Sequence, residues 1–535
     1  MTQLIAKTAI APTAKPIRGS TGHPLFLLLR PLTSLRLTVT LFAMSIFLVF
    51  AGTLAQVDRG IWTIMDEYFR TFIAWIDLRI FFPRSWNIPA KTFPFPGGWL
   101  IGAALLTNLI LAHSLLFKVK AQGRQLALGF TLLLAGIALT WMVLAGAFQD
   151  FIDKFQFMSF GRVLWRLILG EIGALVLLAA CILLFSRRAG IVLLHAGIAL
   201  ILVSEMVTGL FAVEATMTLT EGETVNFVDL SQRSELAIID SSAPEHDTVT
   251  VIPGSMLQQR GATIRNDQLP FDVEVVDYFP NSEIPIETSS FESQLHNIDE
   301  ALEHYRQMPT PPPFLITEAE KARERLLAQF EQLRQQLTRS GVTAGAGLEM
   351  LIQPKPEGTG VGDMARDAPG LIAILKDKQT QQPLGTYLLS YWFDANFSSR
   401  FLDVPQVVRV GDRSYTLYFR PERVYKPYAL HLINFHHETY LGTEIPKDFS
   451  SFVKVYDAQG NEDREVRIWM NTPLRYAGET FYQSAFIPGD RGTILQVVKN
   501  VGWMIPYVAC MIVATGLIAH MGNNLFSFLQ RRLAA

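Results

Sequence analysis

Five of the ionisable residues inside long apolar runs of this sequence suggest by their types what chemistry the chain can do. They are three histidines and two glutamates, namely His113, Glu171, His195, Glu205 and His520. Placing an ionisable side chain in lipid is costly, so each such residue is a functional hypothesis. Imidazole nitrogens can ligate a metal or a haem iron, and carboxylates can carry protons or hold cations.

The histidines predict a ligand site near one membrane boundary. His113 lies five residues before Lys118, and His195 lies seven residues after Arg188. At the helical rise per residue, both imidazoles lie roughly 8 to 10 Å from that boundary. Two imidazoles at one depth can supply both axial ligands of a haem held between helices, and His520 is a third candidate. The alternative is that each histidine makes an interhelical hydrogen bond or meets interfacial water.

The two glutamates predict a second polar site, in the opposite half of the membrane. Glu171 and Glu205 lie about eight and seven residues from the outer ends of their apolar runs, so they share a depth. Two carboxylates that meet in lipid share a proton or hold a cation. A structural hydrogen-bonded pair and a proton relay are both consistent with this spacing.

The composition indicates a membrane protein. Half of the 535 residues are hydrophobic, only 18% are charged, and the mean hydropathy is +0.25. This is too apolar for a soluble enzyme of this size. The net charge of −2 predicts no nucleic-acid partner. The two cysteines, Cys181 and Cys510, lie in apolar runs and build neither a CxxC redox pair nor a cysteine metal site.

About 20 apolar residues in a helix cross the hydrocarbon core of a bilayer. Six windows of the sequence meet this length, and they predict transmembrane helices at 35–56, 98–117, 126–147, 163–185, 189–212 and 502–521. The first window follows a polar, basic arm at 1–34 and is predicted to be a retained helix rather than a cleaved signal.

The basic residues that flank these windows predict the orientation, because cytoplasmic loops are enriched in lysine and arginine. Four groups of them fall on one side of the predicted spans: Lys7, Lys15, Arg18, Arg30 and Arg36; Lys118, Lys120 and Arg124; Arg187 and Arg188; and Arg531 and Arg532. Both termini are therefore predicted to be cytoplasmic, in a chain embedded in the cytoplasmic membrane. The long segment 213–500 is predicted to lie in a periplasm or its equivalent.

The remaining segments complete a polytopic α-helical membrane protein with a large extracytoplasmic β-rich domain. Strand patterns at 235–240, 271–279, 452–456 and 465–469 predict a sandwich-like or curled sheet. Apolar residues at helical spacing predict a helical insertion at about 290–340, whose second helix is expected to begin at a Thr317 and Glu320 capping box. The predicted division is a cytoplasmic arm at 1–34, helices one to five at 35–212 with an interfacial aromatic loop at 57–97, the outer domain at 213–500, helix six at 501–521 and a cytoplasmic tail at 522–535.

The outer domain offers no catalytic pattern. GxSxG and HExxH signatures are absent, so no catalytic residue is predicted. His431, His436 and His437 are close in sequence, but adjacent His436 and His437 point to opposite faces of a strand. Structural roles are therefore favoured for them over an extracytoplasmic metal or haem site, and no metal site is predicted.

Two strings near the C-terminus carry a family resemblance. The first is IPKDF at 445–449, and the second runs from NTPLRY at 471–476 to GETFYQS at 478–484. Together with RPLTSLR at 30–36, GTLAQ at 52–56 and LHAG at 194–197, they resemble the ResB family, also called CcsB, of membrane proteins in system II cytochrome c biogenesis. The resemblance extends over nearly the whole chain.

The resemblance implies a role in attaching haem to c-type apocytochromes outside the cytoplasmic membrane. It implies work with a CcsA-type partner that carries the tryptophan-rich haem-presenting motif, which this chain lacks. The chain is then a non-catalytic subunit of a haem-lyase complex, with haem b bound transiently. His195 lies in the LHAG string and is the first candidate ligand, with His113 second and His520 third.

Three points stay open at the level of sequence. The hairpin at about 126–185, which contains Glu171, is additional to the four spans of typical ResB members. A haem-free membrane scaffold or chaperone for apocytochrome is the alternative function, and it predicts dispensable membrane histidines. An electron-transfer subunit is disfavoured because no outer histidine pair lies within the spans, and a transporter would leave the large outer domain unexplained.

Overall fold

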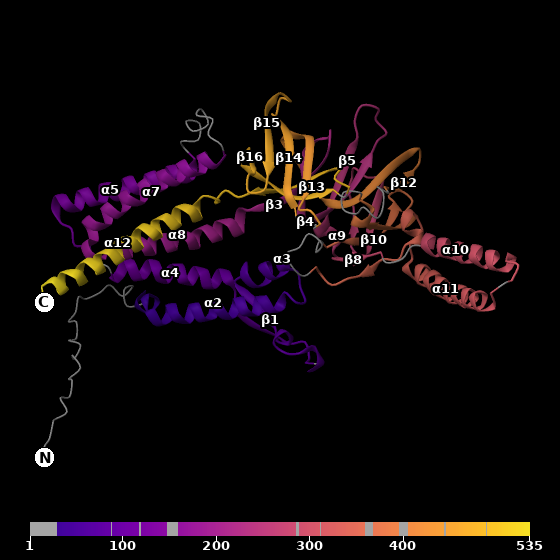
Figure 1. Ribbon diagram of the computed structural model, residues 1–535, viewed down its shortest axis with the longest axis horizontal. Coiled ribbons are helices and arrows are strands. Elements are labelled where there is room, and N and C mark those ends of the chain that lie inside the picture. Colours follow the sequence, from indigo (N-terminus) through magenta and orange to yellow (C-terminus); the bar gives the residue numbers. More distant parts are fainter. Residues whose placement is uncertain are drawn as a thin grey trace, which may run out of the picture.

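A computed structural model gives the architecture of the chain (Figure 1). It describes residues 29–86, 88–116, 119–146, 159–284, 288–310, 312–358, 367–394, 405–442, 446–487 and 489–534. A group of long helices leads into an elongated β-rich region, from which two further helices project at the far end (Figure 1). Of the charges used to predict orientation, Lys7, Lys15, Arg18 and Lys118 lie outside these residues.

The apolar runs form long helices, as predicted. These are α2 (Leu35–Ala55), α4 (Gly98–Leu116), α5 (Gly123–Ala145), α7 (Ser159–Phe185), α8 (Ala189–Phe211) and α12 (Ile505–Leu533). Within the described residues, five helical segments could cross a membrane by length and composition, and one of these, Leu164–Phe211, contains most of α7 and all of α8. The number of spans stays a prediction. The last helix continues to Leu533, so most of the predicted tail is helical.

The long helices pack in two groups. In the first, α2 and α4 share a core with β1 (Ile73–Asp77) and β2 (Thr92–Pro96), an antiparallel pair in the outer loop. In the second, α5, α7, α8 and α12 pack together through glycines. A Cβ added at Gly516 of α12 would lie 2.5 Å from the backbone nitrogen of Leu194 in α8. These two helices therefore pack backbone against backbone, as small residues allow in membrane bundles.

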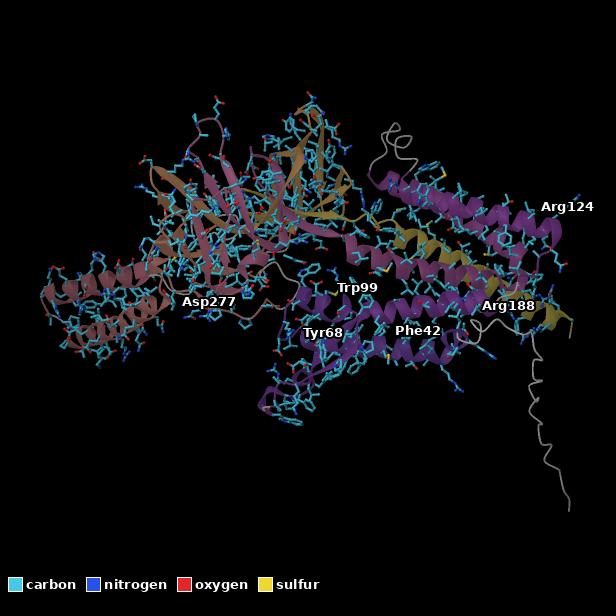
Figure 2. All side chains as sticks on the ribbon, turned by 180° about the vertical axis from the view of Figure 1, so that it is seen from behind. Phe42, Tyr68, Trp99, Arg124, Arg188 and Asp277 are labelled. Carbon is cyan, nitrogen blue, oxygen red and sulfur yellow. The ribbon has the colours of Figure 1, made fainter. Side chains whose placement is uncertain are left out.

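The helix ends far from the β-rich region are basic. Figure 2 shows Arg124, at the start of α5, and Arg188, between α7 and α8, at that end. Trp99, in the first turn of α4, lies at the opposite end, where the helices approach the β-rich region (Figure 2). Arg124 and Arg188 are two of the charges on which the predicted orientation rests, and that orientation stays a prediction.

The strands nearest the membrane helices form a curled sheet. Its order is β15 (Glu462–Trp469), β14 (Pro446–Tyr456), β13 (Arg413–Thr439), β4 (Thr224–Asp240), β3 (Val213–Thr220), β18 (Gly492–Lys499), β17 (Glu479–Ile487) and β16 (Leu474–Tyr476). Its two ends meet, because Arg464 Nη2 of β15 donates to the carbonyl oxygen of Arg475 in β16 at 3.1 Å. Buried side chains from both long arms of the sheet, among them Leu430, Val453 and Phe481, fill the interior.

A second β core lies farther from the membrane helices. The outer halves of β4 and β13 continue into it and pack against a sheet of shorter strands. That sheet has the order β11 (Pro383–Ser390), β10 (Gly370–Asp377), β7 (Phe271–Phe279) and β6 (Thr263–Ile264), whereas β5 (Thr248–Pro253) pairs with β4 and β12 (Gln406–Val410) pairs with β13. The predicted strands at 235–240, 271–279, 452–456 and 465–469 therefore all form, and the last two pair as a hairpin.

Two helices, α10 (Thr288–Gln307) and α11 (Pro313–Ser340), extend from this second core as an antiparallel hairpin (Figure 1). Their facing sides bury Phe291, Leu326 and Leu333. The predicted capping box is wrong, because α11 begins at Pro313 and the hydroxyl of Thr317 donates to the Pro313 carbonyl inside the helix. Proline suits the first helical position, where its missing N–H costs nothing. The remaining short elements are α3 (Ile61–Ile64), α9 (Gly254–Leu257), β8 (Ser282–Glu283) and β9 (Gln353–Pro354).

Candidate functional site

The two histidines predicted at equal depth meet in the structure. His113 Nε2 of α4 lies 3.1 Å from His195 Nδ1 of α8, and the ring centroids are 4.5 Å apart. Both rings are half-buried. The contact is made where α4, from the first helix group, approaches α8 of the second. The pair therefore links the two groups at the basic end of the bundle.

Backbone carbonyls fix the tautomers of this pair. His113 Nδ1 lies 2.9 Å from the carbonyl oxygen of Leu109, and His195 Nδ1 lies 2.8 Å from that of Ile191. A carbonyl oxygen can only accept, so each Nδ1 must carry a hydrogen. His113 Nε2 is then the acceptor of the contact between the rings. The lone pair of His195 Nε2 is not used in any of these hydrogen bonds.

The pair suits one axial ligand of a haem better than two. Two histidine nitrogens on opposite sides of an iron lie roughly 4 Å apart with the macrocycle between them. The 3.1 Å between His113 and His195 leaves no such space, so joint ligation requires the rings to separate. Each ring nevertheless has the support that ligating histidines use, an Nδ1–H held by a backbone carbonyl. One imidazole of the pair therefore fits as a ligand while the other orients it.

His520 lies elsewhere on the basic side of the bundle. Its Nε2 is 3.2 Å from Asn524 Nδ2, one turn along α12. The backbone of His520 packs against the start of α8, where a Cβ added at Gly190 would lie 2.6 Å from the His520 nitrogen. The third candidate ligand is therefore bonded within its own helix rather than to the histidine pair.

The two glutamates have different surroundings. Glu171 of α7 is half-buried, and its Oε1 accepts a hydrogen bond from Thr515 of α12 at 2.9 Å. Glu205 of α8 is exposed, and within the described part of the chain it has no hydrogen bond or ion pair. The described contacts therefore do not join the two carboxylates into one site.

The outer histidines occupy separate positions on β13. His431 Nδ1 lies 2.9 Å from the Thr224 hydroxyl, and His436 Nε2 lies 3.5 Å from Glu438 Oε1 on the exposed side. Within the described residues, no group of three or more histidine, cysteine or acidic side chains could hold a metal ion.

His437 has a distinct environment that the sequence did not indicate. Its Nδ1 lies 3.0 Å from Asp490 Oδ1, and its ring packs against Phe486 with centroids 4.6 Å apart and the ring planes tilted by 36°. Phe449 packs edge-on against the same ring. His437 Nε2 is buried and has no partner among the described residues. Asp490 adopts a left-handed backbone, with φ of 53°, in the turn between β17 and β18.

The strings that carry the family resemblance come together in the curled sheet. From IPKDF, Asp448 pairs with Arg467 at 2.8 Å, and Phe449 packs on His437. From GETFYQS, Gln483 Oε1 accepts a hydrogen bond from Ser451 of β14 at 2.6 Å. The two strings therefore lie on strands near opposite ends of the strand order, and they come into contact because the sheet curls.

The second string also supplies a buried carboxylate. Glu479 is 6% exposed and accepts hydrogen bonds from Lys426 Nζ, at 2.6 Å, and from the Tyr428 hydroxyl. Burial and the neighbouring carboxylate raise the pKa of Tyr428 well above its usual value, which keeps the phenol a donor. This network joins β13 to β17 inside the sheet.

Two further buried ion pairs lie where β4 and β13 pass from one β core to the other. Arg420 and Glu235 are cross-strand neighbours whose Nε and Oε1 are 3.0 Å apart, and both side chains are buried. Arg423 pairs with Asp229 at 3.3 Å, and burial raises the pKa of Asp229 to about 6. The junction between the cores is therefore polar and paired.

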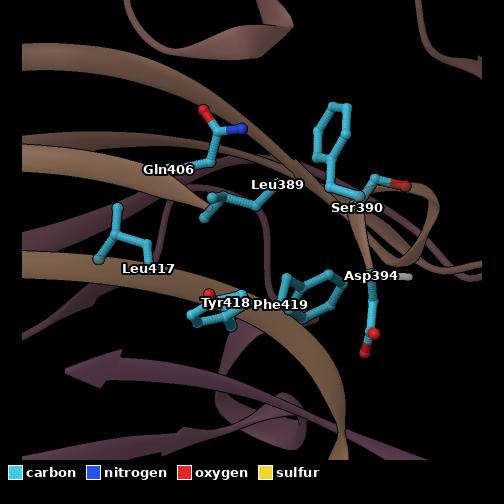
Figure 3. A pocket seen from close by; sticks show the side chains of 8 residues that line it. Leu389, Ser390, Asp394, Gln406, Leu417, Tyr418 and Phe419 are labelled. Carbon is cyan, nitrogen blue, oxygen red and sulfur yellow. The ribbon is translucent and has the colours of Figure 1, made fainter. Parts of the chain in front are cut away.

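A small pocket lies beside this junction (Figure 3). It encloses about 230 Å³, part of it open to solvent, and it lies among Leu389, Ser390, Phe393, Asp394, Gln406, Leu417, Tyr418 and Phe419. Most of this lining is apolar, with the Asp394 carboxylate and the Gln406 amide at its edges (Figure 3).

Comparisons with known proteins agree with the resemblance. Residues 402–502, which include strands β12 to β18, match the sequence model of the ResB-like family. Over 109 residues the chain is 28% identical to Protein NrfI of Wolinella succinogenes, a match covering 20% of this chain and 12% of that protein. The recognition of the ResB family from its sequence strings is thereby confirmed.

Proposed function

We propose that this ResB-like chain is a component of a cytochrome c maturation complex, in which it handles haem, apocytochrome or both at the outer face of the cytoplasmic membrane. The observation that carries the proposal is the match of residues 402–502 to the ResB-like family. A membrane helix bundle joined to a large β-rich region supports it. Such an arrangement suits a protein that links the membrane interior to an extracytoplasmic substrate.

The proposed topology puts both termini in the cytoplasm and the β-rich region in the periplasm. It is supported by the arginines at the helix ends far from the sheets (Figure 2). Both β3 and β18, the strands that connect directly to α8 and α12, leave the bundle at its other end. In this proposed topology, only the apolar helices cross the membrane.

The histidine pair supports haem handling near the cytoplasmic boundary. Haem b bound there would be the group that is later attached to apocytochrome. His195 would offer its Nε2 lone pair, while the Ile191 carbonyl and His113 hold the other side of its ring. Ligation of haem to apocytochrome is assigned to a CcsA-type membrane partner, as the family resemblance implies.

The test compares c-type cytochrome content and bound haem in the same cells. With the chain deleted, c-type cytochromes should be lost, and the wild-type gene should restore them. His195→Ala should reduce restoration by at least about tenfold and remove the low-spin haem spectrum of the purified complex. The matched control His431→Ala alters an outer histidine and should leave both unchanged. Full restoration by His195→Ala would exclude this histidine as a ligand.

The alternative is a haem-free scaffold that binds apocytochrome with its β-rich region. The direct contact between His113 and His195 favours it, because a hydrogen bond between helices is a sufficient role for both rings. Under this alternative, the double variant His113→Asn with His195→Asn restores cytochromes and the purified complex contains no haem. Loss of cytochromes in that variant, with the chain still present in the membrane, would exclude the scaffold.

A further inference from the structure

Glu205 is an intramembrane carboxylate that the fold presents outward. It lies six residues before the end of α8, so its Cα is roughly 9 Å below that end. The side chain is exposed, and the described residues give it no hydrogen bond or ion pair. An exposed carboxylate at this depth would face hydrocarbon, where it is costly without a partner.

Glu171, the other intramembrane glutamate, has a hydrogen-bond donor within this bundle. Glu171 is half-buried between α7 and α12 and accepts a hydrogen bond from Thr515. The fold can therefore provide a donor to a carboxylate at this level. It does so for Glu171 and not for Glu205, which indicates that the partner of Glu205 comes from outside the described chain.

The neighbours of Glu205 on α8 are also presented outward. Met206 is 47% exposed and Leu210 is 51% exposed, whereas Ser204 is fully buried. One cation lies close to this part of α8: the Nε of Arg70 is 4.0 Å from the position of a Cβ on Gly209. Arg70 pairs instead with Asp66, at 3.3 Å.

We infer that Glu205, Met206 and Leu210 form a docking surface for a membrane-spanning helix of another protein, one that carries a lysine or arginine at the depth of Glu205. Charge complementarity selects this occupant over a second copy of the chain, because a symmetric contact would bring two Glu205 carboxylates together. The inference rests on the proposed function and deepens it, since it specifies the surface and the chemistry of the membrane partner.

The experiment uses the full chain in its native membranes. A photo-crosslinking amino acid at position 206 marks the contacting helix, and mass spectrometry locates the crosslinked residue. The same group at position 134, where Leu134 is 66% exposed on α5, is the control for lipid-facing positions. We expect crosslinks to a single helical turn of another membrane protein from position 206 and not from position 134.

Charge variants then test the role of Glu205. Glu205→Lys should reduce the crosslink yield about tenfold, and Glu205→Gln by less, since it keeps a hydrogen-bonding group. Replacing the basic residue of the crosslinked turn by glutamate should restore the yield in the Glu205→Lys background. Glu171→Gln, which alters the internal glutamate, should leave the yield unchanged. The normal amount of each variant in the membrane shows that it folds and inserts.

Three outcomes would overturn the inference. They are a crosslink to a second copy of the chain, an unchanged yield in Glu205→Lys, and restoration by reversing Arg70 of the same chain. Cytochrome content, measured in parallel, separates this inference from the proposed function. Charge-swap rescue of the contact with no cytochrome dependence would retain the docking surface and exclude the role in maturation.

Discussion

The helix bundle and the β-rich region differ in how far their ionisable side chains are paired within the chain. In the β-rich region each of the buried pairs Arg420–Glu235 and Lys426–Glu479 is complete within the chain. In the bundle, Thr515 donates a hydrogen bond to Glu171, and His113 contacts His195. Glu205, in contrast, is exposed and has no partner among the described residues. Buried charges of the first kind hold a fold together, whereas ionisable groups that the fold leaves open are available to a ligand or partner.

The largest effect that this comparison predicts is at Glu479. Glu479→Gln should destabilise the β-rich region by about 3 to 5 kcal/mol, because it leaves the buried ammonium of Lys426 without a counter-charge. Thermal unfolding of the full chain in detergent, followed by circular dichroism of the sheet, measures the change. Glu462→Gln, at an exposed pair with Lys454, should change stability by less than about 1 kcal/mol. Equal effects at the two sites would show that the buried network is not structural.

Helix packing in the bundle should be nearly as sensitive at one glycine. Gly516→Val should cost about 1 to 3 kcal/mol or more, since its Cβ would lie 2.5 Å from the Leu194 backbone nitrogen. Resistance of the purified chain to unfolding in denaturing detergent measures the loss. Gly102→Val in α4 meets no atom within 4 Å of the new Cβ and should be tolerated. A tolerated Gly516→Val would contradict the close contact of α8 with α12.

The junction between the two β cores should respond to pH. The pKa of Asp229 in the fold is about 6, above its usual value, so the folded state binds this proton more tightly than the unfolded state. Stability should therefore rise by about 1 kcal/mol as the pH falls from 7 to 5, through protonation of Asp229. Denaturant unfolding at the two pH values measures this difference.

The control for the pH effect is Asp229→Asn, which mimics the protonated form. Histidines of the outer region also titrate in this interval, so the informative quantity is the difference between wild type and variant. The variant should lose about 1 kcal/mol of the pH response. An unchanged response would assign it to the histidines instead.

The same comparison explains how much could be predicted from sequence. Apolar runs gave the long helices to within a few residues, because the membrane imposes a length that composition reports. Helix α12 was the exception: after residue 521 its apolar residues are mixed with polar ones, and a helix of that kind does not register as a span. The strings at 445–449 and 478–484 gave the family, which the match over 402–502 confirmed.

The candidate site was predicted in part. Equal depth correctly suggested that His113 and His195 could meet, but depth along a helix says nothing about rotation around it. The 3.1 Å contact, and the outward position of Glu205, depend on that rotation. His437 with Asp490, and Glu479 with Lys426, lie 53 residues apart in each case, and only strand pairing brings them together. Phe435, two residues before His437 and thus on the same face of a strand, was the one nearby signal that this histidine faces the interior.

The smallest predicted effect on stability is at the histidine pair. An interhelical hydrogen bond in a membrane contributes about 0.6 kcal/mol on average, so His113→Asn or His195→Asn should barely change the resistance of the bundle to unfolding. Gly516→Val, at the contact of α12 with α8, is the positive control for that measurement. If either histidine variant lowers stability by several kcal/mol, the pair is a structural link between the two helix groups. If both histidine variants keep their stability while cytochrome maturation fails, the pair serves a ligand rather than the fold. It then resembles Glu205, for which we infer a partner outside the chain.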